Sequence, residues 1–210
     1  MGNRERIIET TLRLMNELGA EAVGTNRIAA EAGVSPGNLY YHFSNREEIV
    51  HTLFDALEDE FHDVLQRDVV RPLPPERIAA FYLRTFDLAW RYRFFFNGTL
   101  GLLRRDPVLA ARYQGFQSWA IAELDSIASG IAADGNLIHP RGAAGIASLA
   151  LGTWLIWSNW IGFLQISGIT AIQRNDLTAG INQLFDVIAP YLVPRFETAI
   201  RDCIAHQWAP

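Results

Sequence analysis

Apolar residues recur every three or four positions along most of the chain, a spacing that predicts amphipathic helices rather than strands. Besides two shorter helices near residue 35, the expected helices are 3–18, 45–69, 76–92, 94–103, 107–132, 142–173, 176–189 and 194–208. Pro72, Pro74 and Pro75 interrupt the pattern, because proline cannot continue a helix. The pattern therefore indicates an all-α chain with a boundary at these prolines.

Residues 27–43, which read RIAAEAGVSPGNLYYHF, predict two brief helices joined by a tight turn. Gly33 suits the C-terminal cap of the first helix, since glycine adopts the required backbone conformation without strain. Ser35 can cap the second helix with its hydroxyl, and Pro36 fits the first helical position. This order of residues is typical of a helix-turn-helix.

The second of these helices has two different faces. Leu39 and Phe43, four residues apart, are expected to point into the core. The residues left for the outer face are Gly37, Asn38, Tyr40, Tyr41 and His42. Exposed aromatic side chains call for a partner, and so short a helix can enter the major groove of DNA. For Tyr40, an aromatic cluster that only holds the domain together is the alternative.

The same stretch resembles the N-terminal signature of the TetR family of one-component bacterial transcriptional regulators. The matching residues are Thr25, the segments IAAEAGVS and GNLYYHF, and residues 45–48, so the resemblance covers the first fifty residues or so. It implies that Tyr40, Tyr41 and His42 contact the DNA backbone and bases. It also implies repression that a ligand bound in the rest of the chain relieves.

Other residues around the turn are expected to contact phosphates. Thr25 should cap the helix that follows it and offer its hydroxyl to a phosphate, with Arg27 beside it. The family usually has Lys where Arg46 stands, and Arg keeps the positive charge. The full set of predicted DNA-binding residues is Thr25, Arg27, Ser35, Pro36, Gly37, Asn38, Tyr40, Tyr41, His42 and Arg46.

The charge of the chain excludes a protein that coats nucleic acid without specificity. The sequence has 18 basic residues, all of them Arg, against 23 acidic ones, for a formal net charge of −5. Residues 1–50 hold five Arg and seven acidic residues. Any DNA binding must therefore come from a few cationic groups and helix ends aimed at phosphates.

Aromatic residues are dense between residues 90 and 119 and again near residue 155. Packing in a plain core explains most of them, and a cavity for an apolar or aromatic small molecule would explain the rest. The predicted ligand-binding residues are Trp90, Phe95, Tyr113, Trp119, Trp154 and Trp157.

Between Arg141 and Arg174 the sequence has no charged residue, a run long enough to span a membrane. Polar residues such as Asn159 and Gln165 interrupt the run, which favours a helix buried within a subunit on one side and against a second subunit on the other. With the following helix it would form a four-helix dimer interface. The predicted interface residues are Ser148, Gly152, Leu155, Asn159, Gly162, Ile181, Leu184, Phe185 and Ile188.

The polar face of helix 45–69 permits one alternative function. His51, Asp55, Asp59, His62 and Asp63 share this face, but a bundle metal site needs paired motifs on different helices. A solvated acidic face is the expected reading, with no metal and no cofactor.

The sequence offers no set of catalytic side chains, so we expect no enzyme. The single cysteine, Cys203, rules out a disulfide within the chain and fits a reducing compartment. The N-terminus lacks an apolar signal core, which favours the cytoplasm.

The sequence thus predicts an N-terminal three-helix DNA-binding domain at 1–46, a connecting helix and Pro-rich boundary at 47–74, and a helical ligand-binding and dimerisation domain at 75–210. The expected partners are a double-stranded, palindromic DNA operator, a small-molecule effector and a second copy of the chain, with no membrane. The first alternative is a DNA-binding protein that needs no ligand, and the less favoured alternative is a helical-bundle metal protein.

Overall fold

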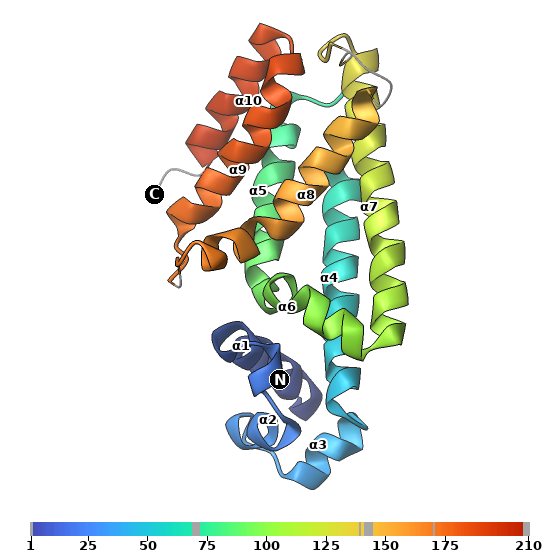
Figure 1. Ribbon diagram of the computed structural model, residues 1–210, viewed down its shortest axis with the longest axis vertical. Coiled ribbons are helices and arrows are strands. Elements are labelled where there is room, and N and C mark those ends of the chain that lie inside the picture. The colour runs from blue at the N-terminus through green and yellow to red at the C-terminus, as the bar shows by residue number, and fades with distance from the viewer. Residues whose placement is uncertain (1, 69–71, 139, 141–144, 170, 208–210) are drawn as a thin grey trace. The chain divides into compact units, whose positions relative to one another are not determined.

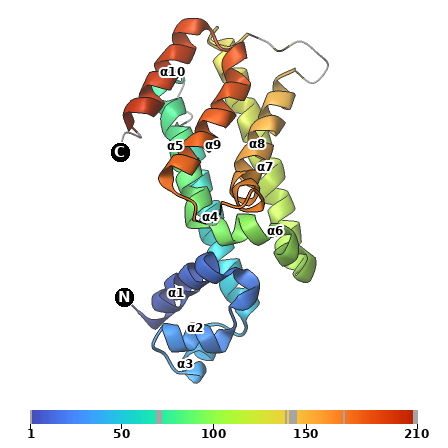
Figure 2. The same ribbon diagram turned by 60° about the vertical axis from the view of Figure 1, so that its left-hand side comes forward.

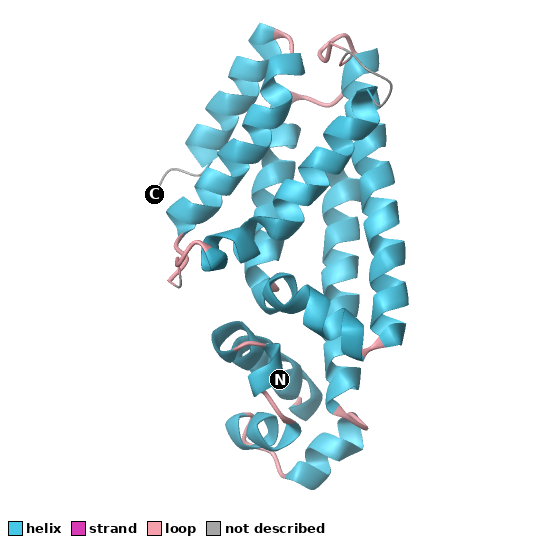
Figure 3. Cartoon of the chain, in the orientation of Figure 1, coloured by secondary structure: helices cyan, strands magenta, loops and turns pink. Residues whose placement is uncertain are grey.

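The computed structural model describes residues 2–68, 72–138, 140, 145–169 and 171–207. Over these residues the chain forms ten α-helices and two short 3-10 helices, with no strand (Figure 3). The helices are α1 (Asn3–Leu18), α2 (Thr25–Glu31), α3 (Pro36–His42), α4 (Arg46–Asp68), α5 (Pro75–Arg91), α6 (Arg93–Arg105), α7 (Pro107–Ala133), α8 (Gly145–Ile166), α9 (Arg174–Ile188) and α10 (Pro194–Gln207). The all-α prediction is confirmed.

The contacts within the chain divide it into two compact units. The first unit comprises residues 1–60 and 91–114, and the second unit comprises residues 61–90 and 115–210. Helices α4, α5 and α7 therefore contribute residues to both units. This division does not coincide with the functional boundaries after residues 46 and 74, which remain predictions.

In the first unit, α1 packs against α2, α3 and α6 (Figure 1). Its buried side chains include Ile7, Leu14 and Met15, which recur with helical spacing as the sequence indicates. Asn16 fixes the same helix from its side: its Nδ2 donates to the carbonyl of Arg91 at 2.8 Å, and its Oδ1 accepts from the N–H of Phe94 at 2.9 Å. Packing and hydrogen bonds thus hold α1 beneath the helix-turn-helix.

The local chemistry of the turn is largely as predicted. Gly33 has a φ of 63°, in the left-handed region that favours glycine, and the Ser35 hydroxyl accepts from the N–H of Asn38 at 3.1 Å. The prediction that Thr25 caps α2 is wrong, because Gly24 holds the cap position and Thr25 is the first helical residue. For α9, the expected start at residue 176 makes Asn175 the predicted cap, but the structure has Gln173 in this position. These two helices begin earlier than the cap signals in the sequence suggested.

In the second unit, α8 packs against α9 (Figures 1 and 2). The bulky side of α8 faces inward: Trp154 and Trp157 are buried, and the indole N–H of Trp157 donates to the carbonyl of Thr85 at 2.9 Å. By length and composition α8 could also cross a membrane, since its mean hydropathy reaches 1.2, but core helices of soluble proteins meet the same criterion. In α8, 39% of this apolar window is buried, so one side of the helix packs within the chain and the other side is exposed.

A short pair of backbone segments, which we call the clasp, joins the chain after α7 to the chain before α10. Leu137 and Leu192 form an isolated antiparallel bridge. The N–H of Ile138 donates to the carbonyl of Tyr191 at 2.7 Å, and the N–H of Val193 donates to the carbonyl of Asn136 at 3.0 Å. The clasp therefore links two parts of the second unit that are distant in sequence.

Among the described glycines of the second unit, Gly180 on α9 has the least space for a side chain. A Cβ at this position would lie 2.5 Å from Cε1 of Phe86 and 2.5 Å from Nε1 of Trp160. Neither ring can move easily, because Phe86 is fully buried and the Trp160 indole N–H donates to the carbonyl of Asp176 at 2.9 Å. Only glycine fits here without displacing an aromatic ring.

We predict that Gly180→Ala lowers the free energy of unfolding by about 1–3 kcal/mol, as expected for overpacking in a close-packed core. Urea denaturation of the purified protein measures this difference. Gly115→Ala on α7 is the matched control, because a Cβ on Gly115 meets nothing within 4 Å and alanine is the better helix former. Equal stability of Gly180→Ala and the unmodified protein would show that the rings relax without cost.

Candidate nucleic-acid interface

The outer face of α3 is aromatic and open to solvent. Tyr41 is 82% exposed and Tyr40 is 51% exposed, whereas Leu39 and Phe43 are buried against the rest of the first unit. The rings of Tyr41 and the half-buried His42 meet edge to face, with centroids 5.1 Å apart. The buried and exposed positions on α3 are those that the four-residue spacing of Leu39 and Phe43 predicts.

Tyr40 also has a structural contact. Its hydroxyl lies 3.1 Å from Oγ1 of Thr25, so a hydrogen bond joins α3 to the first turn of α2. Half of the Tyr40 side chain remains exposed beside this bond. The residue therefore combines the two roles that the sequence left open: it holds the two short helices together and keeps surface available.

Several other predicted residues lie at the surface of the same two helices. Arg27 is exposed on α2, and Ser35, Pro36 and Gly37 are exposed at the start of α3. Asn38 differs, because its Oδ1 is buried and has no hydrogen-bond partner among the described residues.

Sequence analysis did not consider Asn26, which is also exposed in the first turn of α2, between Thr25 and Arg27. Its position next to a predicted helix start was the one signal that could have identified it.

Arg46 is used inside the unit rather than at its surface. Its Nε donates to the carbonyl of Val23 at 2.8 Å, and a terminal nitrogen donates to the carbonyl of Ala20. The side chain is 22% exposed, and its remaining nitrogen lies 3.6 Å from a carboxylate oxygen of Glu47. The guanidinium predicted to contact phosphate thus holds the 20–23 segment against α4.

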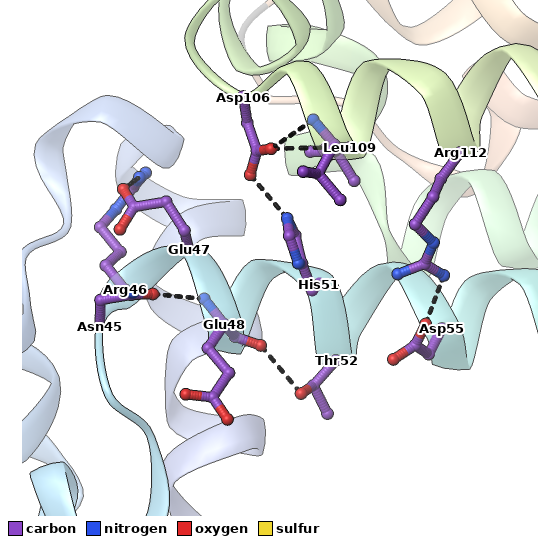
Figure 4. A network of polar contacts seen from close by, with 11 residues as sticks. Asn45, Arg46, Glu47, Glu48, His51, Thr52, Asp55, Asp106, Leu109 and Arg112 are labelled. Carbon is purple, nitrogen blue, oxygen red and sulfur yellow. Dashed lines mark hydrogen bonds and ion pairs between the residues drawn. The ribbon is translucent and has the colours of Figure 1, made fainter.

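Asp106 joins three helices of the first unit (Figure 4). It ends α6, and its carboxylate accepts from the N–H groups of Val108 at 3.0 Å and Leu109 at 2.9 Å in the first turn of α7. Its other oxygen lies 2.6 Å from Nε2 of His51 on α4. Burial acts to raise the pKa of Asp106, but the N–H of Leu109 and the contact with His51 outweigh it, so this pKa lies below its ordinary value.

The polar face of α4 is solvated only in part: Asp55, Asp59 and Asp63 are exposed as the sequence suggested, whereas His51 and His62 are half-buried. Within the first unit, Arg112 bonds to Asp55 and to Glu58, the latter at 2.7 Å. Within the second unit, the ring of His62 stacks on Trp119 with centroids 3.6 Å apart. Among the described residues, no group of three or more His, Cys, Asp or Glu side chains is placed to hold a metal ion.

The six aromatic residues predicted to bind a ligand are divided between the two units. Phe95 and Tyr113 lie in the first unit with ring centroids 5.6 Å apart, and burial raises the pKa of the Tyr113 hydroxyl to about 12. The residues in the second unit are Trp90, Trp119, Trp154 and Trp157. Trp154 and Trp157 pack on each other at 5.3 Å as part of the core, and a cavity in the second unit is lined by none of the six.

The predicted dimer residues separate by exposure. Ser148, Leu155 and Asn159 of α8 are exposed, and Gly152 and Gly162 are partly exposed beside them. In contrast, the residues proposed from α9, which are Ile181, Leu184, Phe185 and Ile188, are buried within the chain. A buried side chain has no surface to offer to a second copy, so the exposed face of α8 is the part of this prediction that the monomer leaves available.

A seven-residue helix with an exposed aromatic outer face, held to a second short helix across a glycine turn, defines a helix-turn-helix DNA-binding protein. The sequence profile described as "Bacterial regulatory proteins, tetR family" matches residues 7–53, and the TetR profile described as "Bacterial transcriptional repressor" matches residues 55–200. The chain belongs to the TetR family of bacterial transcriptional regulators, as the resemblance in its first fifty residues implied.

Individual relatives agree with this assignment. The crystal structure of a TetR-family transcriptional regulator from Marinobacter aquaeolei VT8 is 30% identical in sequence and has a TM-score of 0.86, with 100% of both chains covered. Tetracycline repressor protein class C of Escherichia coli is 39% identical over 54 residues, which span 26% of this chain but only 25% of the repressor. The SmeT–triclosan complex shares the fold, with a TM-score of 0.64 at 16% identity over 93% of this chain and 94% of SmeT.

We predict that Asp106→Asn lowers the free energy of unfolding at pH 7 by about 1.5–3 kcal/mol, the scale of one hydrogen bond to a charged group. Asparagine can still cap α7, so the loss reports mainly on the contact with His51. Because the folded-state pKa of Asp106 is depressed, its contribution is complete above the ordinary carboxyl pKa of 3.8 and disappears as the pH falls through the folded-state value.

Denaturant titrations from pH 7 to pH 2 measure this gap between the variant and the unmodified protein. Asp59→Asn, at an exposed position on α4, is the control. A gap that stays constant over the whole pH range would contradict the assigned role of the carboxylate.

Proposed function

We propose that the chain is a sequence-specific transcriptional regulator, a repressor that leaves its operator when a small apolar molecule binds. The observation that carries the proposal is the outer face of α3, where Tyr40 and Tyr41 are exposed on a helix anchored by Leu39 and Phe43. Large exposed aromatic side chains are otherwise hard to explain on a soluble unit. In a helix-turn-helix, the second helix enters the major groove with such side chains against the DNA.

The charges of the first unit restrict how this interface works. Arg46, and in part Arg112, are committed to partners within the unit, whereas Arg27 is exposed beside α3. DNA binding then depends on a few local donors and not on a broad positive surface, as the acidic composition requires. Arg27 is the expected phosphate contact, and the α3 side chains supply sequence preference.

A homodimer fits the exposed side of α8. Leu151, Leu155, Phe163 and Ile166 are 46%, 50%, 56% and 90% exposed, and their spacing places them on one side of the helix. A monomer rarely leaves such a stripe uncovered. A two-fold dimer through this face would present two copies of α3 to a palindromic operator, with half-sites one helical turn apart or at a related spacing.

Release of the operator needs an effector with different affinities for two states of the protein. The triclosan complex of SmeT, a protein of the same fold, supports a small apolar effector. The solid packing of Trp154 on Trp157 favours the second candidate, a regulator that needs no ligand. A cytoplasmic location follows from binding to chromosomal DNA.

For the DNA interface, we predict that Arg27→Ala weakens binding about equally on all sequences and lowers the slope of log affinity against log salt by about one, as for one lost phosphate contact. Tyr41→Ala should instead weaken the selected operator more than random DNA. Selection of random duplexes on the purified protein supplies that operator, and fluorescence anisotropy measures the affinities. Arg195→Ala, at an exposed position on α10, is the matched control.

Failure of the unmodified protein to enrich any palindrome at low salt would contradict the proposed function. A loss confined to one base position in Arg27→Ala would make this residue a base reader and not a phosphate contact.

For the dimer, we predict that Leu155→Glu shifts the protein to monomers in sedimentation-velocity runs at micromolar concentration. Two carboxylates brought together across a two-fold contact repel each other, and a like-charge pair at an interface costs several kcal/mol. Val108→Glu, at another exposed apolar position, should leave the dimer intact. A dimer that persists in Leu155→Glu would exclude this face of α8 as the interface.

A further inference from the structure

The second unit contains a cavity that has no role in the DNA interface or the dimer interface proposed above. It lies between α5, α7 and α8, and is bordered by Leu137 and Leu192 of the clasp. The cavity contains about 640 Å³ of empty space, part of it open to solvent. A space of this size is in the range that binds small organic molecules.

Most of the cavity wall is apolar. The lining includes Ile78 and Phe81 of α5, Leu124 and Ile131 of α7, and Leu149 of α8. An alkyl chain would lose its contact with water here, and each buried CH₂ group tightens binding by about fourfold. The body of a fitting ligand is therefore aliphatic.

Two side chains of the wall carry hydroxyl groups that have no hydrogen-bond partner within the described chain. Tyr82 of α5 and Thr153 of α8 are 5% and 8% exposed, and neither hydroxyl makes a hydrogen bond with a described residue. By contrast, the buried hydroxyls of Thr85 and Ser158 both donate to helix carbonyls. The two hydroxyls in the cavity wall are therefore available to bond to an oxygen or nitrogen of a bound molecule, and to water when no such molecule is bound.

The polar groups of the wall also limit the charge of the ligand. Burial raises the pKa of Tyr82, so its hydroxyl stays neutral and can donate to a neutral oxygen. Arg77 is half-buried and is the one charged residue among the described residues of the lining. Arg77 has other interactions within the chain, but its positive charge still favours an anionic group at that end of the cavity.

We propose that this cavity binds a medium-chain carboxylate that carries a neutral oxygen, a hydroxyl or a ketone, on its chain. The carboxylate lies by Arg77, the chain fills the apolar space, and the neutral oxygen bonds to the hydroxyls of Tyr82 and Thr153. The proposal rests on the effector part of the proposed function, since it names the class of molecule that releases the operator. It places the site away from the aromatic cluster of Trp154 and Trp157.

Titration calorimetry of the purified full chain without DNA tests the site. The probes are decanoate, 3-hydroxydecanoate, 10-hydroxydecanoate and decan-1-ol. We expect saturable binding of both kinds of acid, with one hydroxydecanoate bound about fivefold more tightly than decanoate, the effect of one net hydrogen bond. Decan-1-ol should bind more weakly than any of the acids.

Three variants separate the contacts. Tyr82→Phe combined with Thr153→Val should abolish the advantage of the hydroxydecanoate and leave decanoate within twofold. Arg77→Gln should weaken all acids and leave decan-1-ol unchanged. Thr178→Val, whose hydroxyl bonds to the carbonyl of Arg174 on α9, is the control and should change nothing.

Two results would overturn the proposal. One is the absence of saturable binding of any acid to the unmodified protein. The other is an advantage of the hydroxydecanoate that survives in the double variant, because the hydroxyls would then be bonded to water only. Ala150→Phe, which fills the cavity from α8, should abolish binding, and equal binding by a folded Ala150→Phe protein would place the acids elsewhere.

The outcome is independent of the DNA experiment. If no palindrome is selected but the hydroxydecanoate binds, the proposed function fails and the cavity site stands. If a palindrome is selected and no acid binds, only the cavity site fails. If both hold, adding the hydroxydecanoate should weaken operator binding in the unmodified protein and not in the double variant.

Discussion

The burial of two side chains, Leu39 and Phe43, determines what the first unit can do. A helix of seven residues is unstable on its own, so α3 exists only because its inner face packs against the unit. The same packing decides which side chains remain outside. Ser35 caps the start of α3, and Arg46 ties the 20–23 segment to α4. The surface that α3 presents to solvent thus depends on side chains that are packed or hydrogen-bonded within the unit.

Most of the helical framework could be predicted from the sequence, because helix formation is governed by local spacing and by caps. Both ends of α1 and the inward positions of α3 agree with the prediction. The deviations are small and local: Gly24 and Gln173, rather than Thr25 and Asn175, cap α2 and α9. Gly24 and Thr25 are both suitable caps, so the sequence does not decide between them, whereas Gln173 is not one of the residue types that usually cap a helix.

The pairing of distant groups could not be predicted. His51 and Asp106 are 55 positions apart, and no pattern near either residue in the sequence indicates that the two are in contact. Aromatic density was misleading for a different reason: a run of large apolar side chains shows that a region is buried, but not whether the packing is solid or hollow. Trp154 and Trp157 fill the core, whereas the cavity lies beside Tyr82 and Thr153, two residues that look ordinary in their helices.

The clasp adds a kinetic consequence to the cavity that it borders. Leu137 and Leu192 belong both to the cavity wall and to the backbone bridge, so widening the cavity on this side separates the end of α7 from the start of α10. That motion breaks the hydrogen bonds from Ile138 to Tyr191 and from Val193 to Asn136. Entry and exit by this route are then timed by the opening of the clasp and not by the contacts inside. Residence time and affinity would depend on different residues.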